Sequence, residues 1–222
     1  MDNLLKEALI KYISGVILIG LLLFVPAGTL NWNEGWLFMI VLFVPMFVAG
    51  LIMYFKAKDL LRSRLNAKEK QSEQKDVISY SALMFLASFI LAGLNRRFGW
   101  TVLPKPVVTG AAVVFLFGYL LFGEVLRENA YLSRTIEVRK DQKVVDSGLY
   151  GIVRHPMYSA TVLMFLSMPL ILNCIYSFVI MLVYIPLIIK RIRNEEVFLE
   201  KELQGYSEYK KKVKYRLLPY IW

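Results

Sequence analysis

The sequence predicts an all-α integral membrane protein with about six transmembrane helices. Hydrophobic residues make up 57% of its 222 residues, above the roughly 45–50% of soluble domains, and the mean hydropathy is +0.52. A soluble domain of this length has no core large enough to bury so much apolar surface. The apolar residues also gather in runs close to the roughly 20 residues that a helix needs to cross a bilayer.

Six apolar runs give the positions of these helices. Four lie in the first half of the chain, at Tyr12–Leu30, Trp36–Phe55, Val77–Leu94 and Val107–Leu126. Two shorter runs, Met157–Leu172 and Ile175–Ile189, are separated only by Asn173 and Cys174, so they predict a tight helical hairpin. If this hairpin were instead a single kinked helix, the number of spans would be five.

Lys and Arg residues alternate between the segments that join the runs. Under the six-span arrangement, 24 of the 27 Lys and Arg residues fall on one side, together with both termini, and three fall on the other. The positive-inside rule places the basic side in the cytoplasm. No organelle signal is evident, so the plasma membrane is the default location. Contact with anionic lipid headgroups explains the net charge of +10, and no nucleic-acid partner is expected.

Composition excludes several classes of site. Cys174 and His155 are the only residues of their types, so neither a disulfide framework nor a protein-built metal site is expected. The chain also lacks a G-x-G-x-x-G sequence and a P-loop, so it has no dinucleotide-binding domain of the soluble type. Any nucleotide-like cofactor must therefore be held by the polar segments of the second half.

The chain divides into two regions that differ in character. Residues 1–126 form a four-span membrane region with few polar groups, and residues 127–222 carry most of the side chains capable of chemistry. The second region begins with the longest polar loop, 127–156, whose TIEVRKDQKVV stretch predicts an extended or hairpin-like piece. A loop this long in a compact protein is usually functional.

The densest group of polar residues is GLYGIVRHPMY at residues 148–158, where the fifth span begins. Pro156 suits the first turn of that helix, which places His155 beside the free N–H groups of the helix terminus. Such a terminus can hold a carboxylate or another anion. The alternative is a juxtamembrane anchor, with Arg154 and the tyrosines at the interface and Gly and Pro shaping the turn.

A second polar group, RIRNEE at residues 191–196, continues the last span into a cytoplasmic helix of about Lys190–Lys212. The turn of about 100° per residue gives this helix an apolar stripe made of Ile192, Leu199 and Leu203. Glu195 and Glu196 flank this stripe, so both carboxylates border the buried face. The alternative is an ordinary i, i+4 ion pair between Arg191 and Glu195 on a membrane-surface helix.

The tail GYSEYKKKVKYRLLPYIW, at residues 205–222, mixes aromatic residues with lysines. Such a mixture is typical of a segment that anchors at the membrane interface. A sharper interpretation is that the tail closes the cytoplasmic side of a pocket.

Taken in order, these motifs closely resemble those of the isoprenylcysteine carboxyl methyltransferase family. The resemblance covers residues 115–222 and rests on G-x-Y-x-x-x-R-H-P-x-Y, R-x-x-x-E-E and R-x-x-P as a set. Related membrane phospholipid methyltransferases share the RHP and EE elements. Ala160 stands where the family pattern often has Gly, which adds one methyl group near a close helix contact.

The resemblance implies methyl transfer from S-adenosylmethionine in a cytoplasm-facing pocket built by the catalytic region, 127–222. The acceptor would be a lipophilic small molecule or a lipidated substrate, with an isoprenylcysteine-like carboxylate as the first candidate. Arg191 would pair with that carboxylate and Glu195 would hold the guanidinium, so these two are the expected catalytic residues. The expected cofactor contacts are Gln142, Lys143, Val144, Val145, Tyr150, His155, Pro156, Met157, Tyr158 and Glu196. Either Glu195 or Glu196 could face the cofactor.

Three other functions stay open. Methylation of a phospholipid amine or a small thiol would use the same cofactor. Membrane sterol reductases have a similar RHP-containing half, with the pattern RHPNYxGE, and bind NADPH, but here Met157 replaces Asn and Ala160 and Thr161 replace Gly-Glu. A non-catalytic membrane protein or a small transporter would need polar residues deep in several spans, and these spans hold almost none.

Overall fold

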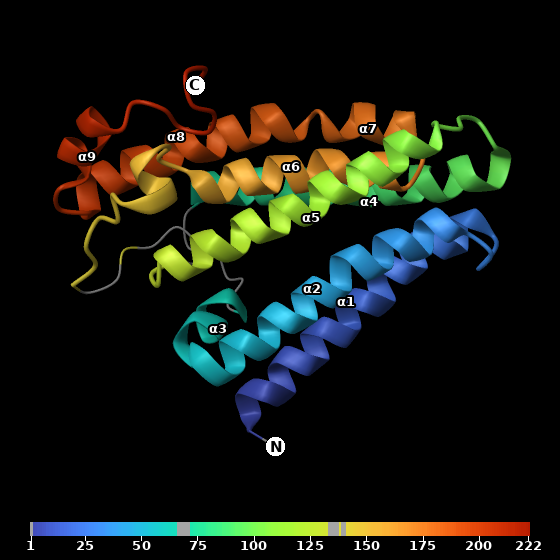
Figure 1. Ribbon diagram of the computed structural model, residues 1–222, viewed down its shortest axis with the longest axis horizontal. Coiled ribbons are helices and arrows are strands. Elements are labelled where there is room, and N and C mark those ends of the chain that lie inside the picture. Colours follow the sequence, from blue (N-terminus) through green and yellow to red (C-terminus); the bar gives the residue numbers. More distant parts are fainter. Residues whose placement is uncertain (1, 66–71, 133–137, 139–140) are drawn as a thin grey trace.

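Apolar α-helices make up most of the described chain (Figure 1). The computed structural model describes residues 2–65, 72–132, 138 and 141–222. Its elements in chain order are α1 (Asn3–Ala27), α2 (Asn33–Lys56), α3 (Lys58–Leu65), α4 (Ser72–Phe98), α5 (Lys105–Glu128), the 3-10 helix η1 (Gly148–Gly151), α6 (Pro156–Ile171), α7 (Ile175–Met181), α8 (Tyr184–Glu202) and α9 (Tyr206–Lys212). No strand occurs among the described residues, and the all-α fold class is confirmed.

Five stretches of helix are long and apolar enough to cross a membrane. They are Asn3–Ala27, Asn33–Lys56, Lys75–Phe98, Lys105–Glu128 and the run Ile175–Glu202 that includes α7 and α8. The sixth apolar helix, α6, has only 16 residues. It forms the predicted hairpin with α7 through a turn in which Asn173 has φ of 60° and the Cys174 amide donates to the Pro169 carbonyl at 2.9 Å. The single kinked helix is therefore not what forms.

The helices sort the joining segments into two ends. In Figure 1, α3, η1, α9 and both termini lie toward one end, and the α1–α2, α4–α5 and α6–α7 turns lie toward the other. These are the two sets of segments that the Lys and Arg counts separate. The predicted extended stretch TIEVRKDQKVV falls partly outside the described residues, and residues 142–147 form neither helix nor strand.

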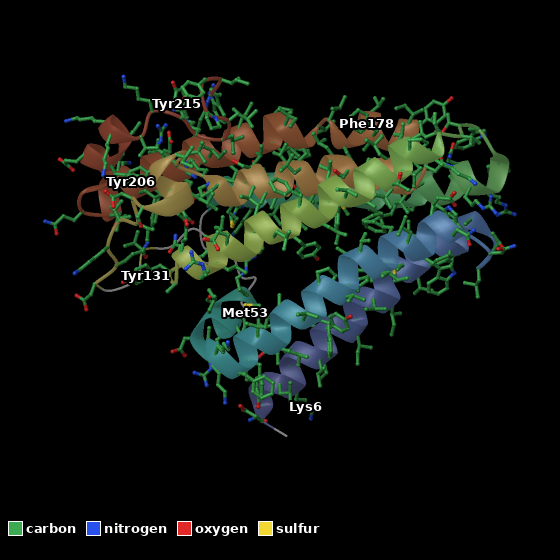
Figure 2. The ribbon with its side chains drawn as sticks, in the orientation of Figure 1. Lys6, Met53, Tyr131, Phe178, Tyr206 and Tyr215 are labelled. Carbon is green, nitrogen blue, oxygen red and sulfur yellow. The ribbon has the colours of Figure 1, made fainter. Side chains whose placement is uncertain are left out.

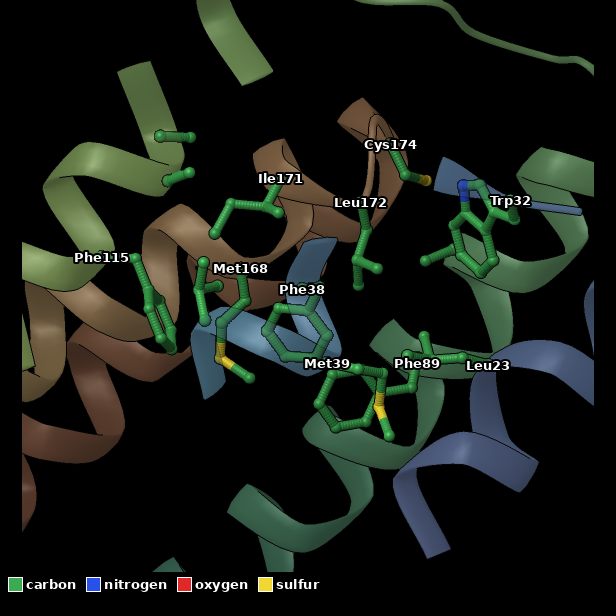
Figure 3. Close-up of a cluster of buried hydrophobic side chains, with 14 of the residues drawn as sticks. Leu23, Trp32, Phe38, Met39, Phe89, Phe115, Met168, Ile171, Leu172 and Cys174 are labelled. Atoms are coloured by element: carbon green, nitrogen blue, oxygen red, sulfur yellow. The ribbon is translucent and has the colours of Figure 1, made fainter. Parts of the chain in front are cut away.

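A buried apolar core ties the two halves of the chain together near the turn end (Figure 3). Leu23, Trp32, Phe38 and Phe115 are almost fully buried in it, beside Ile171 and Leu172 from the hairpin. Lipid is as apolar as these side chains, so close packing and not water exclusion stabilises this contact inside a bilayer. Residues on both sides of residue 126 therefore contribute to one core.

Two helix pairs approach closely at glycines. A Cβ atom built on Gly118 of α5 would lie 2.6 Å from Met164 Cγ and 3.2 Å from the Ala160 carbonyl oxygen of α6. A Cβ on Gly93 of α4 would lie 2.5 Å from the Leu23 carbonyl oxygen of α1. Small residues let helix backbones approach in this way in membranes. Ala160 is itself fully buried at the α5–α6 contact, so its methyl group is accommodated there.

Polar groups at the turn end satisfy one another. The Asn95 amide nitrogen donates to the Thr101 and Asn173 carbonyls, and its oxygen accepts from the amide and hydroxyl of Thr101. The Asn173 side-chain oxygen in turn accepts from the Leu103 amide. The α4–α5 and α6–α7 turns are therefore joined through hydrogen bonds, as buried polar groups require.

The Gly118 contact predicts that Gly118→Leu destabilises the protein by about 1–3 kcal/mol, because the new side chain must displace α6. Gly123→Leu is the matched control, since a Cβ at Gly123 of the same helix meets nothing within 4 Å. Thermal unfolding in detergent should give a lower Tm for the first variant alone. Equal Tm values for the two variants would contradict the packing argument.

Candidate active site

A pocket lies at the end of the molecule that carries α9 and η1. The lining comes from the end of α5 and the loop after it, from η1, from the start of α6 and from α8 and α9. Tyr131 and Tyr206, both pocket residues, are labelled at this end in Figure 2. The predicted site residues that line the pocket are Gln142, Lys143, Val144, Val145, Tyr150, His155, Met157, Tyr158, Arg191 and Glu195. The predicted residues of segment 142–158 and those of α8 therefore line one pocket.

Two predicted cofactor contacts, Pro156 and Glu196, are not among the lining residues. Pro156 is the first residue of α6 and His155 is its N-cap, as the sequence predicts, but the proline is buried behind the pocket wall. Other lining residues were not among the predicted contacts, and they are Asn129, Tyr131, Leu132, Arg154, Leu199, Leu203, Tyr206 and Tyr209. The apolar stripe of the predicted helix Lys190–Lys212 pointed to Leu199 and Leu203, whereas nothing local in the sequence pointed to Asn129. The structure divides that predicted helix, because α8 ends at Glu202 and α9 begins at Tyr206.

One wall of the pocket is fixed by the end of α5. The Glu128 carboxylate accepts from the Leu149 amide at 2.9 Å, and the Asn129 side chain donates to the Tyr150 hydroxyl at 2.9 Å. Gly148 has φ of 57°, and a Cβ there would lie 1.9 Å from the Glu128 carboxylate. This position therefore requires glycine both for its backbone and for the approach of Glu128.

The α9 helix closes the opposite side against the same loop. The Tyr209 hydroxyl donates to the Tyr150 carbonyl at 2.7 Å, and Lys212 pairs with Asp146 at 2.7 Å. The hydrogen bond from Lys212 lowers the pKa of the Asp146 carboxyl. Burial raises the pKa of Tyr150 to about 12, so this phenol is neutral near pH 7.

Glu196 is buried behind the pocket and joins three segments. Its side chain is 4% exposed, and Oε1 accepts from Arg154 Nε at 2.7 Å and lies 3.3 Å from His155 Nε2. Its other oxygen, Oε2, accepts from Arg216 Nε at 2.9 Å. One carboxylate on α8 is thus bound by the RHP turn and by the C-terminal tail.

The tail is attached to the RHP turn through backbone groups as well. The Arg154 amide donates to the Tyr215 carbonyl and the His155 amide to the Arg216 carbonyl, both at 2.9 Å. Arg154 Nη1 also donates to the carbonyls of residues 213 and 214. The free amides that the sequence offered as an anion site are therefore partly used by the chain itself.

Three polar side chains meet inside the pocket between α6 and α8. The Tyr158 hydroxyl donates to Glu195 Oε2 at 2.6 Å and accepts from Arg191 Nε at 2.9 Å. Tyr158 therefore bridges the two residues expected to be catalytic. With Lys143 and Arg154 also in the lining, the pocket offers cations for an anionic group and one carboxylate.

One buried polar group in the pocket lacks a partner within the described chain. Tyr206, the first residue of α9, is 4% exposed, and its hydroxyl makes no hydrogen bond to any described residue. A buried hydroxyl without a partner costs about 1–3 kcal/mol. Such a group in a pocket wall is suited to a polar ligand. Among the residues that the structure describes, no group of three or more His, Cys, Asp or Glu side chains is close enough to hold a metal ion.

One comparison with known proteins concerns the segments that build the pocket and indicates methyl transfer. Residues 106–205 match a family model described as phospholipid methyltransferase. The match runs from the start of α5 to the residue before α9, so it includes the loop, the RHP turn and Glu195 and Glu196 of α8. It supports a membrane methyltransferase and, more broadly, use of S-adenosylmethionine.

A second comparison points to a different enzyme. The chain is 33% identical over 91 residues to the Delta(14)-sterol reductase of Mus musculus. The aligned part covers 40% of this chain and 22% of the reductase, so the chain spans a small part of that relative. The two comparisons therefore name different reactions, a methyl transfer and a sterol reduction.

The buried position of Glu196 predicts that Glu196→Gln destabilises the protein by about 3–5 kcal/mol, because two guanidinium groups lose their shared charge partner. The tail should also become sensitive to protease, since Arg216 is one of its attachments. Thermal unfolding and limited proteolysis in detergent measure both effects.

The matched control is Glu200→Gln on the same helix. Glu200 pairs with Lys210 at the surface, where each side chain is 36% exposed, and such pairs contribute about 1 kcal/mol or less. If both variants unfold at the same temperature with the same cleavage pattern, Glu196 does not hold the site together.

Proposed function

We propose that this protein is an S-adenosylmethionine-dependent methyltransferase that acts on a lipophilic acceptor dissolved in the bilayer. The single observation that carries the proposal is the Arg191–Tyr158–Glu195 group, which lies in a pocket at the end of an apolar helix bundle. The match of residues 106–205 to the phospholipid methyltransferase model supports the reaction class. An acceptor from the bilayer is supported by the apolar helices around the pocket.

The residues present suit this cofactor. S-adenosylmethionine has a nucleoside, a sulfonium and an amino-acid end, so it needs apolar surface, hydrogen-bonding groups and a cation for its carboxylate. Val144, Leu199 and Leu203 offer apolar surface, and Lys143 and Arg154 offer cationic groups, all within the pocket lining. We therefore assign cofactor contacts to the lining residues of the loop and the RHP turn, and assign Pro156 and Glu196 to supporting roles.

A carboxylate of an isoprenylcysteine-like molecule is the favoured acceptor. The bound cofactor supplies an activated methyl group, and in-line transfer mainly requires alignment in a dry site. Arg191 is the group that would orient the acceptor carboxylate through charge-assisted hydrogen bonds. The Tyr158 hydroxyl accepts from Nε of that guanidinium and donates to Glu195, so Glu195 acts on Arg191 through Tyr158. A carboxylate is ionised at neutral pH, so this reaction needs no general base.

A phospholipid amine is the second candidate, and the description of the matching family model favours it. An amine acceptor must lose a proton, and Glu195 is the carboxylate in the pocket that could accept it. Methylation of a small thiol would place the same demand on Glu195. A carboxylate acceptor therefore requires Glu195 to position Tyr158 and Arg191, whereas an amine or thiol acceptor requires it to accept a proton.

The third candidate is an NADPH-dependent reductase, which the sterol reductase comparison favours. Against it, Thr161 stands at the position of the glutamate in the RHPNYxGE pattern, and its hydroxyl is engaged with the Tyr184 hydroxyl at 2.8 Å. Met157 replaces the asparagine of that pattern in the pocket lining. NADPH belongs in every binding experiment as a parallel ligand.

The orientation follows from charge. We infer that the pocket end and both termini face the cytoplasm, since that end carries the Lys- and Arg-rich segments. The plasma membrane stays the default location. The variants Asn3→Cys and Thr101→Cys, labelled with a membrane-impermeant thiol reagent in closed vesicles of known orientation, test the inference. Only the first should be labelled from the cytoplasmic side.

The proposal predicts that purified protein transfers a labelled methyl group from S-adenosylmethionine to a farnesylated cysteine acid. Alkali releases the label as methanol only from a carboxyl methyl ester, so the product identifies the acceptor group. Arg191→Ala should lower kcat/KM by about 100-fold through loss of alignment, while the Kd of the cofactor stays close to its original value.

Arg193→Ala is the matched control, because Arg193 is an exposed residue of the same helix, outside the pocket. An alkali-stable methyl group on phosphatidylethanolamine would establish the amine acceptor in place of the carboxylate. Binding of NADPH without binding of S-adenosylmethionine would overturn the proposed function.

A further inference from the structure

The unpartnered hydroxyl of Tyr206 marks a place in the pocket that the proposed reaction does not use. Tyr206 and Tyr209 come from the same seven-residue helix, α9, and are 4% and 5% exposed. The Tyr209 hydroxyl is bound to the Tyr150 carbonyl, whereas the Tyr206 hydroxyl has no partner among the described residues. Both residues line the pocket. Among the described residues, the two tyrosines therefore differ in one hydrogen bond, which Tyr209 makes and Tyr206 does not.

The surroundings of Tyr206 are apolar on one side. Tyr206 belongs to a buried cluster with Leu203, Tyr209 and Val213, against which Val144 and Leu199 pack. The Tyr206 and Tyr209 rings are 5.7 Å apart and tilted by 57°. Three members of this group, Val144, Leu199 and Leu203, line the pocket beside Tyr206. A flat, mostly apolar ligand group with one polar edge fits such a wall.

The other side of the pocket has a different character. There Tyr158, Arg191 and Glu195 form the polar group to which the proposed function assigns the methyl acceptor. Burial, together with the charges of Glu196 and Glu195, raises the pKa of the Tyr206 phenol, so the hydroxyl keeps its proton and can donate.

We propose that Tyr206 is a cofactor-binding residue whose hydroxyl hydrogen-bonds the nucleoside part of S-adenosylmethionine in the apolar half of the pocket. This inference rests on the proposed function and adds a division of the pocket to it. The purine and ribose lie against α9, and the methyl-bearing end points to the group formed by Arg191, Tyr158 and Glu195. The C-terminal tail thereby becomes a part of the binding site and not only an anchor.

The assignment to the nucleoside follows from the chemistry of the wall. The amino-acid end of the cofactor carries two charges at neutral pH, and its carboxylate suits Lys143 and Arg154 of the lining, whereas the apolar wall of Val144, Leu199 and Leu203 offers no ion partner. A purine has apolar faces and polar edges, and a ribose has two neutral hydroxyls. Either can lie against Leu199 and Leu203 and still hydrogen-bond the Tyr206 hydroxyl, which has no partner among the described residues.

The experiment compares Tyr206→Phe with Tyr209→Phe in the full-length protein in detergent. Each variant removes one oxygen and keeps the ring. Calorimetry gives the Kd of S-adenosylhomocysteine and of 5′-methylthioadenosine, which has the nucleoside but no amino-acid end. Thermal unfolding without ligand is measured in parallel, and Tyr220→Phe, at a side chain that is 87% exposed, is the affinity control.

Tyr206→Phe should raise the Kd of both ligands by a similar factor, about three- to tenfold for one hydrogen bond, without lowering the Tm of the unliganded protein. Tyr209→Phe should lower that Tm, because it removes a bond within the chain. Tyr220→Phe should change neither quantity.

Two results would overturn the inference. Wild-type affinity of Tyr206→Phe for both ligands would mean that the hydroxyl does not touch the cofactor. A weaker Kd for S-adenosylhomocysteine alone would move the contact to the amino-acid end. Failure of the proposed function has a different signature, since the wild-type protein would then bind neither adenosyl ligand.

Discussion

The site depends on one buried carboxylate. Glu196 accepts hydrogen bonds from Arg154 and Arg216 and contacts His155, so it joins α8, the start of α6 and the tail. Charges buried in this way are costly to desolvate, and they are tolerated only when they are paired with good geometry. Here the pairing joins the same three segments that an apolar cluster also packs together, with Tyr158 from α6, Ile192 from α8 and Leu217 from the tail. Glu195, the residue before Glu196 in α8, lines the pocket instead.

The two ends of the helix bundle solve the same physical problem differently. Helices satisfy their own backbone groups inside a bilayer, but the segments that join them must find partners elsewhere. At the turn end, Asn95, Thr101 and Asn173 satisfy one another. At the pocket end, backbone groups of the RHP turn and of the tail pair in the same manner, yet the Tyr206 hydroxyl is left without a partner among the described residues. The polar groups named at the turn end are therefore satisfied within the chain, whereas the pocket end has a hydroxyl that is available to the proposed ligand.

Much of this arrangement could be predicted from the sequence. Apolar runs of known length gave the helices, Pro156 gave the first residue of α6, and the alternation of Lys and Arg grouped the joining segments. Ten of the expected site residues do line the pocket, because the RHP motif and the last helix each place several of them at once. These features depend on local patterns, which a single sequence contains.

The remaining features depend on contacts between distant segments. Glu195 and Glu196 both flank the apolar stripe of α8, and the contacts of Glu196 with the RHP turn and with Arg216 of the tail distinguish the buried carboxylate from the other. The role of Tyr206 is equally invisible in the sequence, where it resembles Tyr209 three residues later. The two differ because the Tyr150 carbonyl lies within reach of only one hydroxyl. Neither distinction has a periodicity or a motif of its own.

The length of α6 has a consequence for how the protein meets its bilayer. With 16 residues, α6 is about 24 Å long, whereas the hydrocarbon layer is about 30 Å thick. Its neighbour α5 has 24 residues and is about 36 Å long. Because α6 ends with its partners at the turn end, its first residue lies below the level where α5 ends. For an acceptor held in the bilayer, as the proposed function requires, this difference in length would shorten the distance between the acyl chains and the RHP turn.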